Sequence, residues 1–470
     1  MFNFKTQKFF IYCALIFGII MIAVIPPFQS PDEDSHFKKA YVVSYGKLYP
    51  SSQNGVVGYN LPNDMVKYIN EKLSTYTGNR NKKYSYDEQI IDDRLPKDYS
   101  DVSFYNFSTA ETMPFAYLGP ALGVWVARIS SAIVGLKNIS ITHMLYFARF
   151  FSLLLYIIIV AFAIKITPIL KKTFCAIALI PMSLSLAAAI SYDSVLMATS
   201  LLATAIIFKL IFDDNVKKIN YKYIVGLGVI GFILLSVKTV YATVLLPIIF
   251  VPKEKFDGGS KKSIIKTFEI IIGISVGLFL LNKLPALFIK KAAGDGAITA
   301  QIQFILNHPI YYIKVWLTSM ISNRNFYLSG MFGTFGLLDT YVLTMFMVVY
   351  FIAFFAVVLS DLSTCKNKFN WKYKIVSVLG NVISIFGIFI ALYILWTSSE
   401  IGIGAPTITG VQGRYFLPLL PLAIVLLSNK WMVKNEKMKT IFVRVLQNSY
   451  LVSFLGLLVS CLTIFLRFWC

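Results

Sequence analysis

The amino-acid sequence predicts an all-α polytopic membrane protein with about 11 transmembrane helices. Of its 470 residues, 57% are hydrophobic and only 14% are charged, and a soluble domain of this length could not bury so much apolar surface. Several apolar runs reach the roughly 20 residues that a helix needs to cross the hydrocarbon layer. Lys and Arg fall in the segments between these runs, as they do in the cytoplasmic loops of membrane proteins.

Charge and motifs exclude several classes of function. The net charge of +21 does not indicate a nucleic-acid partner, because the basic residues lie between spans and not along one soluble face. The five cysteines show no metal-ligand spacing and no disulfide framework. The sequence has no Walker motif, dinucleotide-binding fingerprint, zincin motif or nucleophile elbow, which argues against a nucleotide-driven pump and a serine hydrolase.

The first predicted element is the apolar run from Phe9 to Pro27, which two lysines precede. It lacks a small-residue cleavage site and acidic residues follow it, so residues 1–27 are expected to be a retained transmembrane helix with a cytoplasmic N-terminus. Residues 28–142 are expected to form a large extracytoplasmic loop with an acidic motif and amphipathic interfacial helices. Within this loop, stretch 113–136 either crosses the membrane or lies in the interface.

Residues 143–284 are expected to form a transmembrane core. Stretch 174–191 is predicted to cross once and stretch 223–251 twice, because the latter is too long for one crossing and has Lys238 in its middle. If 113–136 lies flat, every lysine-rich loop then falls on the side of the N-terminus, as the positive-inside rule requires. These loops are residues 171–172, 217–222, 253–262, 366–374 and 430–439.

Residues 285–338 are expected to form a second extracytoplasmic loop, and residues 339–470 the C-terminal transmembrane helices, including a crossing at 414–428. The same count of crossings brings the scarce acidic and basic residues at span ends to the outer surface. Chemistry is therefore expected on the extracytoplasmic side of the cell membrane.

An acidic motif, Ser30-Pro31-Asp32-Glu33-Asp34-Ser35-His36, directly follows the first span. Ser30 fits a helix N-cap, with Glu33 closing a capping box, so the motif predicts the start of a helix. Capping does not explain three carboxylates and a histidine beside a membrane, and a carboxylate there could act as a general base. We take Asp32 and Glu33 as candidate catalytic residues, with pure capping as the alternative. His36, four residues beyond Asp32, shares its helix face and is a candidate substrate-binding residue.

Two cations are candidates for binding a phosphate. Lys238 lies in apolar surroundings, where a charge is costly and function is the default hypothesis. Arg414, in Gly410-Val411-Gln412-Gly413-Arg414, could hold a phosphate with two parallel hydrogen bonds. The alternatives are a lysine that snorkels to the interface and an interfacial arginine anchor.

Asp193 and Asp339 each stand near the start of an apolar run, where they either cap a helix or belong to the site. The first outer loop is dense in tyrosine, which suits sugar rings and membrane interfaces alike, and the sequence does not separate these uses. The remaining candidate substrate-binding residues are Tyr241, Gln412, Arg324 and Arg149.

Four segments together resemble the bacterial integral-membrane family catalogued as domain of unknown function 2142. They are PPFQSPDEDSHFKKAYVVSYGKLYP (26–50), ISYDSVLMATSLL (190–202), FGLLDT (335–340) and VQGRYFLPLLPL (411–422). One span, an acidic pair at the head of a large outer loop, and many further spans also resemble the GT-C glycosyltransferase superfamily. The resemblance covers most of the chain.

The resemblance implies a membrane glycosyltransferase that transfers a sugar from a polyprenyl-phosphate-linked donor to a cell-envelope glycan or polymer. It implies an acceptor-activating base at Asp32 or Glu33, a second acidic residue at Asp193, and donor phosphate held by Lys238 and Arg414. Some GT-C members use a divalent metal, Mg or Mn, and the sequence does not decide this point; membrane lipids are the other expected partners. The alternatives are an envelope polysaccharide polymerase or ligase, and a lipid-linked-sugar flippase or transporter, for which the sequence shows no clear internal repeat.

Overall fold

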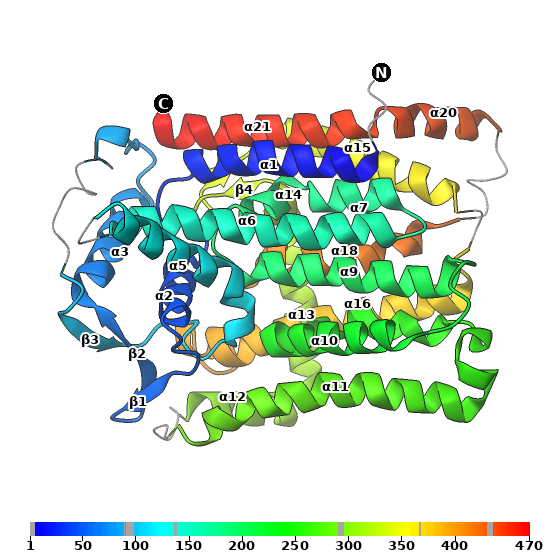
Figure 1. The fold of residues 1–470 in the computed structure, drawn as a ribbon, viewed down its shortest axis with the longest axis horizontal. Helices are drawn as coiled ribbons and strands as arrows, with labels where there is room; N and C mark the ends of the chain where they lie inside the picture. The colour runs from blue at the N-terminus through cyan, green and yellow to red at the C-terminus, as the bar shows by residue number, and fades with distance from the viewer. Residues whose placement is uncertain are drawn as a thin grey trace.

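The computed structural model describes residues 5–88, 90, 98–135, 139–289, 296–365, 368–429 and 436–470. Within these described residues, eight helices are long and apolar enough to cross a membrane, and most of them run side by side along the long axis of the molecule (Figure 1). These candidate spans are α1 (Thr6–Val24), α6 (Ile141–Ile166), α9 (Tyr192–Phe212), α10 with η2 (Tyr221–Phe250), α11 (Lys261–Leu287), α15 (Thr344–Ser363), α16 to α17 (Trp371–Glu400) and α21 (Ser449–Trp469). The predicted all-α polytopic class is confirmed.

The most buried of these spans is α9, and α11 is the most exposed. Polar side chains at the N-caps define where several of the spans begin, since they accept hydrogen bonds from otherwise unpaired backbone N–H groups. The capping residues are Ser140 for α6, Ser191 for α9, Asn220 for α10, Ser260 for α11 and Asn370 for α16.

Stretch 223–251 folds back on itself, as predicted. Helix α10 (Tyr221–Lys238) ends where Lys238 takes an extended backbone conformation, and the 3-10 helix η2 (Thr239–Phe250) then returns beside it. Leu245 of η2 packs next to Gly231 of α10. At the far end, the backbone N–H of Ile219 donates to the carbonyl of Lys255 (2.8 Å). Lys238 therefore lies at the tip of a helical hairpin.

Two other predicted crossings are not single α-helices. Stretch 174–191 contains two short buried helices, α7 (Lys171–Ala178) and α8 (Pro181–Ala187). Ile180 is extended between them because the following proline disfavours a helical residue before it. Stretch 414–428 consists of η6 (Gly413–Leu419), α18 (Leu420–Ala423) and η7 (Ile424–Leu427), with prolines inside. The three folded-back or broken segments account for the difference between about 11 predicted crossings and eight candidate spans.

Stretch 113–136 forms η1 (Pro114–Tyr117) and the 16-residue helix α5 (Leu118–Ile133). Helix α5 runs antiparallel to the N-terminal half of α6, where Gly123 approaches the backbone of Phe147. It is too short to be a candidate span. Its outer side carries an exposed apolar stripe, which suits contact with lipid in either alternative. This stripe consists of Leu118, Leu122, Trp125, Ile129 and Ile133.

Residues that precede α5 build a small unit at one end of the bundle, which we call the sheet end (Figure 1). Helix α2 (Glu33–Ser44) lies crosswise to the spans there. The strands pair antiparallel in the order β1-β2-β3, an element that the sequence analysis did not predict. The other elements of this unit are β1 (Ser51–Gln53), β2 (Val56–Pro62), α3 (Asn63–Tyr76) and β3 (Val102–Tyr105).

The predicted second loop, 285–338, is largely helical where it is described. Trp316 packs against Phe386 of α16 with ring centroids 5.3 Å apart. The elements are α12 (Ala297–Asn307), α13 (Pro309–Ser322), α14 (Arg324–Phe332) and the two-stranded hairpin of β4 (Thr334–Phe335) and β5 (Thr340–Tyr341).

The lysine-rich loops gather at the opposite end, which we call the lysine end. Ring contacts join these loops there: Phe212 lies 5.4 Å from Phe369, and Phe250 lies 5.1 Å from Tyr373. Residues 366–367 and 430–435, which carry part of the predicted loops, lie outside the described residues. The remaining elements are η3 (Lys253–Lys255), η4 (Asp257–Gly259), the π-helical turn η5 (Tyr393–Thr397), α17 (Ser398–Glu400) and α20 (Glu436–Gln447).

Candidate functional site

Four candidate residues from distant parts of the sequence meet at the sheet end of the bundle. The Nη2 atom of Arg414 lies 2.5 Å from Oδ2 of Asp32, and its Nε lies 3.4 Å from Oδ2 of Asp193. The Nζ atom of Lys238 lies 3.4 Å from Oδ1 of Asp193. Acids and bases thus alternate in a chain, which we call the charge cluster: Asp32, Arg414, Asp193 and Lys238.

Exposure rises along this chain from its middle to its ends. The side chains of Arg414 and Asp193 are 2% and 6% exposed, whereas those of Lys238 and Asp32 are 24% and 51% exposed. Buried charges are tolerated only when they are paired, and the two central residues satisfy this condition for each other. The exposed carboxylate and the half-exposed ammonium are the groups that a ligand can reach.

The backbone of Asp32 has a left-handed conformation, with φ 60° and ψ 10°. Left-handed residues other than glycine are uncommon and cluster at functional sites. Helix α2 begins at Glu33, and its N-cap residue Asp32 makes no side-chain capping bond. The predicted capping box of Ser30 and Glu33 is therefore wrong, because the helix begins after Asp32 and the carboxylate of Glu33 is engaged with Arg149.

Glu33 and Arg149 form a separate, fully buried ion pair. Glu33 accepts hydrogen bonds from Nε (2.8 Å) and Nη2 (2.6 Å) of Arg149 and from the backbone N–H of Ile190 (3.2 Å). Arg149 also donates to the carbonyls of Ile25 (2.6 Å) and Pro26 (2.9 Å). Both side chains are 0% exposed. The pair fastens the end of α1 and the start of α2 to α6.

His36 lies behind the charge cluster. It is 1% exposed, and its Nδ1 is hydrogen-bonded to the hydroxyl of Tyr117 (2.7 Å). Its ring meets the ring of Tyr192 edge-on, with centroids 4.7 Å apart. Burial lowers the pKa of His36 to about 4, so the ring is neutral at physiological pH. The histidine packs and orients its neighbours without reaching solvent.

Two tyrosines that the sequence analysis did not single out flank Lys238. Its ammonium lies 3.9 Å from the ring centroid of Tyr415 and 4.9 Å from that of Tyr192, within cation–π range. The buried Tyr241 donates from its hydroxyl to the carbonyl of Tyr415 (2.8 Å). Tyr192 and Tyr415 directly adjoin Asp193 and Arg414, which is the one signal that could have identified them.

Local backbone features hold Asp193 and Arg414 in place. The hydroxyl of Ser191 accepts a hydrogen bond from the N–H of Asp193 (3.1 Å), so Ser191 is the N-cap of α9 and the capping alternative for Asp193 is wrong. Gly413 packs directly against the carbonyl of Tyr327 in α14, where a side chain would not fit. The carbonyl oxygen of the Gln412 amide is buried and accepts no hydrogen bond from the described residues.

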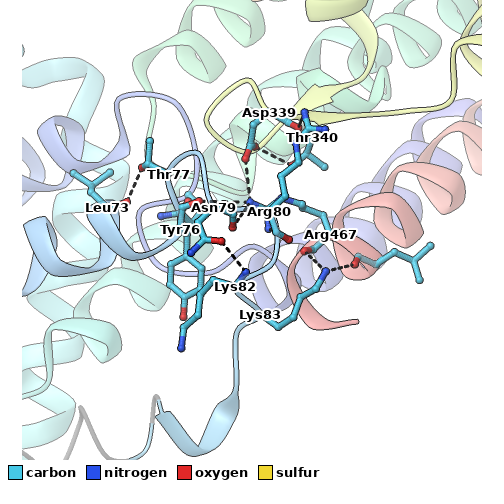
Figure 2. Close-up of polar contacts among 12 residues, drawn as sticks. Leu73, Tyr76, Thr77, Asn79, Arg80, Lys82, Lys83, Asp339, Thr340 and Arg467 are labelled. Atoms are coloured by element: carbon cyan, nitrogen blue, oxygen red, sulfur yellow. Dashed lines mark hydrogen bonds and ion pairs between the residues drawn. The ribbon is translucent and has the colours of Figure 1, made fainter.

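Asp339 lies in a second polar cluster at the end of α21 (Figure 2). Its carboxylate is 3.1 Å from Nη2 of Arg467, and its carbonyl accepts from Arg80 (2.9 Å). Lys83 donates to the carbonyl of Arg467 (3.0 Å). Helix α15 begins only at Thr344, so Asp339 is not its N-cap. This cluster ties the segment after α3 and the β4–β5 hairpin to the last span.

Arg324, like Asp339, Glu33 and Arg149, lies outside the charge cluster. It is the first residue of α14, is exposed, and donates to the nearby carbonyl of Ile321 (2.9 Å).

A cavity of about 370 Å³ opens beside the charge cluster. Lys238, Tyr192 and Tyr415 form its polar wall. The π-helical turn η5, a rare conformation that often marks functional sites, contributes Leu395 to the opposite wall. The other lining residues are mostly apolar: Thr239, Val240, Gly387, Ile388, Ala391 and Leu392. Such a cavity can take an apolar chain whose anionic head meets the lysine.

The described residues contain no group of three or more His, Cys, Asp or Glu side chains that could hold a metal ion. Asp32 and Asp193 face arginine and lysine, and these cations already balance the carboxylate charge. The charge cluster therefore does not fit a divalent Mg or Mn ion, and Lys238 and Arg414 can supply the positive charge that an anionic ligand needs.

Comparison with known proteins confirms the resemblance to the family catalogued as domain of unknown function 2142. No curated protein and no solved structure matches the chain. A family profile described as predicted membrane protein (DUF2142) matches residues 15–423, and this range contains all four members of the charge cluster. Because the match extends over most of the chain, the protein belongs to the DUF2142 family of predicted membrane proteins.

Proposed function

We propose that this protein is a GT-C-type glycosyltransferase. It transfers a sugar from a polyprenyl-phosphate-linked donor to a cell-envelope glycan or polymer. One observation carries the proposal: the exposed carboxylate of Asp32 belongs to a chain of ion pairs that ends at Lys238, and Lys238 lines an apolar cavity. A lipid phosphate, an apolar chain and an acceptor hydroxyl each find a complementary group there.

The distribution of lysine supports an extracytoplasmic site. Cytoplasmic loops of membrane proteins are rich in Lys and Arg, and the lysine-rich loops of this chain gather at the end opposite to the charge cluster. With the lysine end in the cytoplasm, the N-terminus is cytoplasmic and the charge cluster faces the outer leaflet.

Lys238 is suited to the donor phosphate, because lysine offers a compact charge and its ammonium is partly exposed. Arg414 is 2% exposed and is paired with Asp32 and Asp193, so it acts on the phosphate through its positive charge. The apolar wall of the cavity can receive the first units of the lipid chain, while the phosphate stays at the headgroup level. Both cations stabilise the charge that develops when the phosphate leaves.

Asp32 is suited to act as the general base. Its carboxylate accepts the proton of the acceptor hydroxyl as the oxygen attacks the anomeric carbon of the donor sugar. The bond between that carbon and the phosphate oxygen breaks, and the lipid phosphate departs with the bonding electrons. A single displacement inverts the configuration at the anomeric carbon. Glu33 cannot replace Asp32, because Arg149 and Ile190 occupy its oxygens.

The test is transfer by the full-length protein in liposomes, supplied with radiolabelled polyprenyl-phosphate sugars and an envelope glycan acceptor. Asp32→Asn is expected to abolish transfer, and Lys238→Ala to weaken donor use. Asp34→Asn is the matched control, because Asp34 lies on the same turn but pairs with Lys38 (3.1 Å). If Asp32→Asn transfers sugar as well as the wild type does, Asp32 is not the general base. Failure to use any of the lipid-linked sugars would remove the proposal itself.

The broken helices favour one second candidate. Helices α7 and α8 interrupt one membrane segment and the hairpin at Lys238 turns another back, features that transporters use around their binding sites. A lipid-linked-sugar flippase would move the labelled lipid across the liposome bilayer without forming a new glycosidic bond. The two functions are distinguished by the chemical identity of the labelled product.

A further inference from the structure

A second pocket lies in the unit at the sheet end, apart from the charge cluster. It measures about 170 Å³ and forms between the last turns of α2 and the strands β2 and β3. We call it the tyrosine pocket. Its lining combines three phenol rings with one amine and one amide: Tyr41, Tyr45, Tyr99, Lys47 and Asn60, with Val42, Pro62 and Val102 around them.

The aromatic side chains of this pocket are arranged for binding as well as for packing. The rings of Tyr41 and Tyr45 lie 5.0 Å apart, and their hydroxyls are within 3.4 Å of each other. Tyr45 is 47% exposed, with the guanidinium of Arg128 only 3.5 Å from its ring centroid. Lys47 and Asn60 are exposed at the rim. Aromatic faces beside hydrogen-bonding groups complement a sugar, which has apolar faces and polar edges.

A membrane belt does not account for this pocket. The apolar stripe of α5, which contains Trp125, is the part of this unit that suits the interface. The tyrosine pocket contains a lysine and an asparagine, and its floor is the edge of a small sheet. Both residues would be poorly placed in hydrocarbon.

Helix α2 connects this pocket with the charge cluster. Its N-cap residue, Asp32, belongs to the charge cluster, and Tyr41 and Tyr45 lie near its C-terminal end. From the start of α2 to Tyr41 and Tyr45 the axial distance is about 12 to 18 Å. A short oligosaccharide can cover this distance, and a single sugar cannot.

We infer that the tyrosine pocket binds a sugar unit of the glycan acceptor, remote from the hydroxyl that reacts at Asp32. This inference rests on the proposed function, because that proposal makes Asp32 the place where the acceptor reacts. Binding of a sugar in the tyrosine pocket does not itself require transfer. It makes the acceptor an oligosaccharide long enough to reach from the tyrosine pocket to Asp32. Contacts remote from the reacting centre then select long acceptors over short ones.

The test uses full-length protein in nanodiscs on an array of neutral and acidic envelope-type oligosaccharides. The wild type is expected to bind at least one of these oligosaccharides. A triple variant, Tyr45→Ala, Lys47→Ala and Asn60→Ala, is expected to lose about tenfold or more in affinity. All three side chains are exposed, so the fold should survive. Tyr86→Ala, an exposed tyrosine that packs on Trp469 instead, is the matched control.

The outcomes separate the inference from the proposed function. Asp32→Asn is expected to retain wild-type glycan affinity. If the wild type binds no oligosaccharide, or if the triple variant binds as well as the wild type, the tyrosine pocket is not a glycan site, whatever the transfer assay shows. If binding depends on the pocket but no lipid-linked sugar is transferred, the inference stands and the proposed function fails. In the transfer assay, the triple variant should raise KM for long acceptors only.

Discussion

Substitution of Glu33 should destabilise the protein, whereas substitution of its neighbour Asp32 should leave the protein stable but inactive. Glu33→Gln leaves Arg149 buried without its counter-ion, and both side chains are 0% exposed. Breaking one partner of a buried ion pair costs about 3–5 kcal/mol, a large part of the roughly 5–15 kcal/mol that stabilises a typical folded protein. The backbone N–H of Ile190 also loses a carboxylate acceptor. We therefore expect Glu33→Gln to destabilise the protein by at least about 3 kcal/mol.

Asp32→Asn should have little effect on stability. The side chain of Asp32 is 51% exposed, so water screens its charge and its ion pair contributes less than the fully buried pair of Glu33 and Arg149. Arg414 keeps Asp193 as its second partner. The expected pattern is a stable but inactive Asp32→Asn variant beside an unstable Glu33→Gln variant.

The assay is reversible unfolding in mixed micelles, with SDS as the denaturant, for wild type and both variants. A double variant, Glu33→Leu with Arg149→Met, serves as the control, because apolar replacement of both partners of a buried pair is often neutral. It should recover most of the stability lost in Glu33→Gln. If Glu33→Gln unfolds within about 1 kcal/mol of the wild type, the assignment of Glu33 to a structural pair is refuted.

Three further predictions concern the surroundings of the site. Gly413→Ala forces a methyl group against the carbonyl of Tyr327; it should cost about 1–3 kcal/mol in the same unfolding assay and weaken donor use. Lys39 is buried, with its Nζ 2.7 Å from the hydroxyl of Tyr59, and burial lowers its pKa from 10.5 to about 7. Between these values the unfolded chain binds a proton that the folded chain does not, so stability relative to Lys39→Met should rise from pH 7 to pH 10; a flat difference would contradict this. Arg467→Met removes the partner of Asp339 and should speed hydrogen exchange in residues 76–83, whereas unchanged exchange would show that the cluster does not hold this segment.

Much of the site could be predicted from residue types and their positions along the chain. Asp193 and Arg414 stand near the ends of apolar runs and Lys238 stands in the middle of one, and a charge in apolar surroundings needs a partner or a function. The turn at Lys238 followed from length alone, since one crossing cannot accommodate the whole stretch. With two crossings in this stretch, the lysine-rich loops fall on one side of the membrane, and Asp193, Lys238 and Arg414 are expected together at the opposite end of the bundle.

The role of a residue could not be predicted where it depends on a contact with a residue far away in the sequence. Asp339 has the same sequence context as an N-cap, but Arg467 and Arg80 engage it in a hairpin. The broken helices α7 and α8 were read as one span because their residues are apolar throughout, and one proline decides the break. The small sheet was missed because its strands are short and their pairing is not local.

By itself, the sequence determined that this protein crosses a membrane many times and where its charges cluster along the chain, because the thickness of the hydrocarbon layer and the cost of burying charge are the same for every sequence. Only the tertiary structure decided which carboxylate is exposed. Asp32 and Glu33 are adjacent, but the arginine that meets Glu33 lies 116 residues away and the one that meets Asp32 lies 382 residues away. Pairings over such distances result from the packing of whole helices, and no local pattern encodes them.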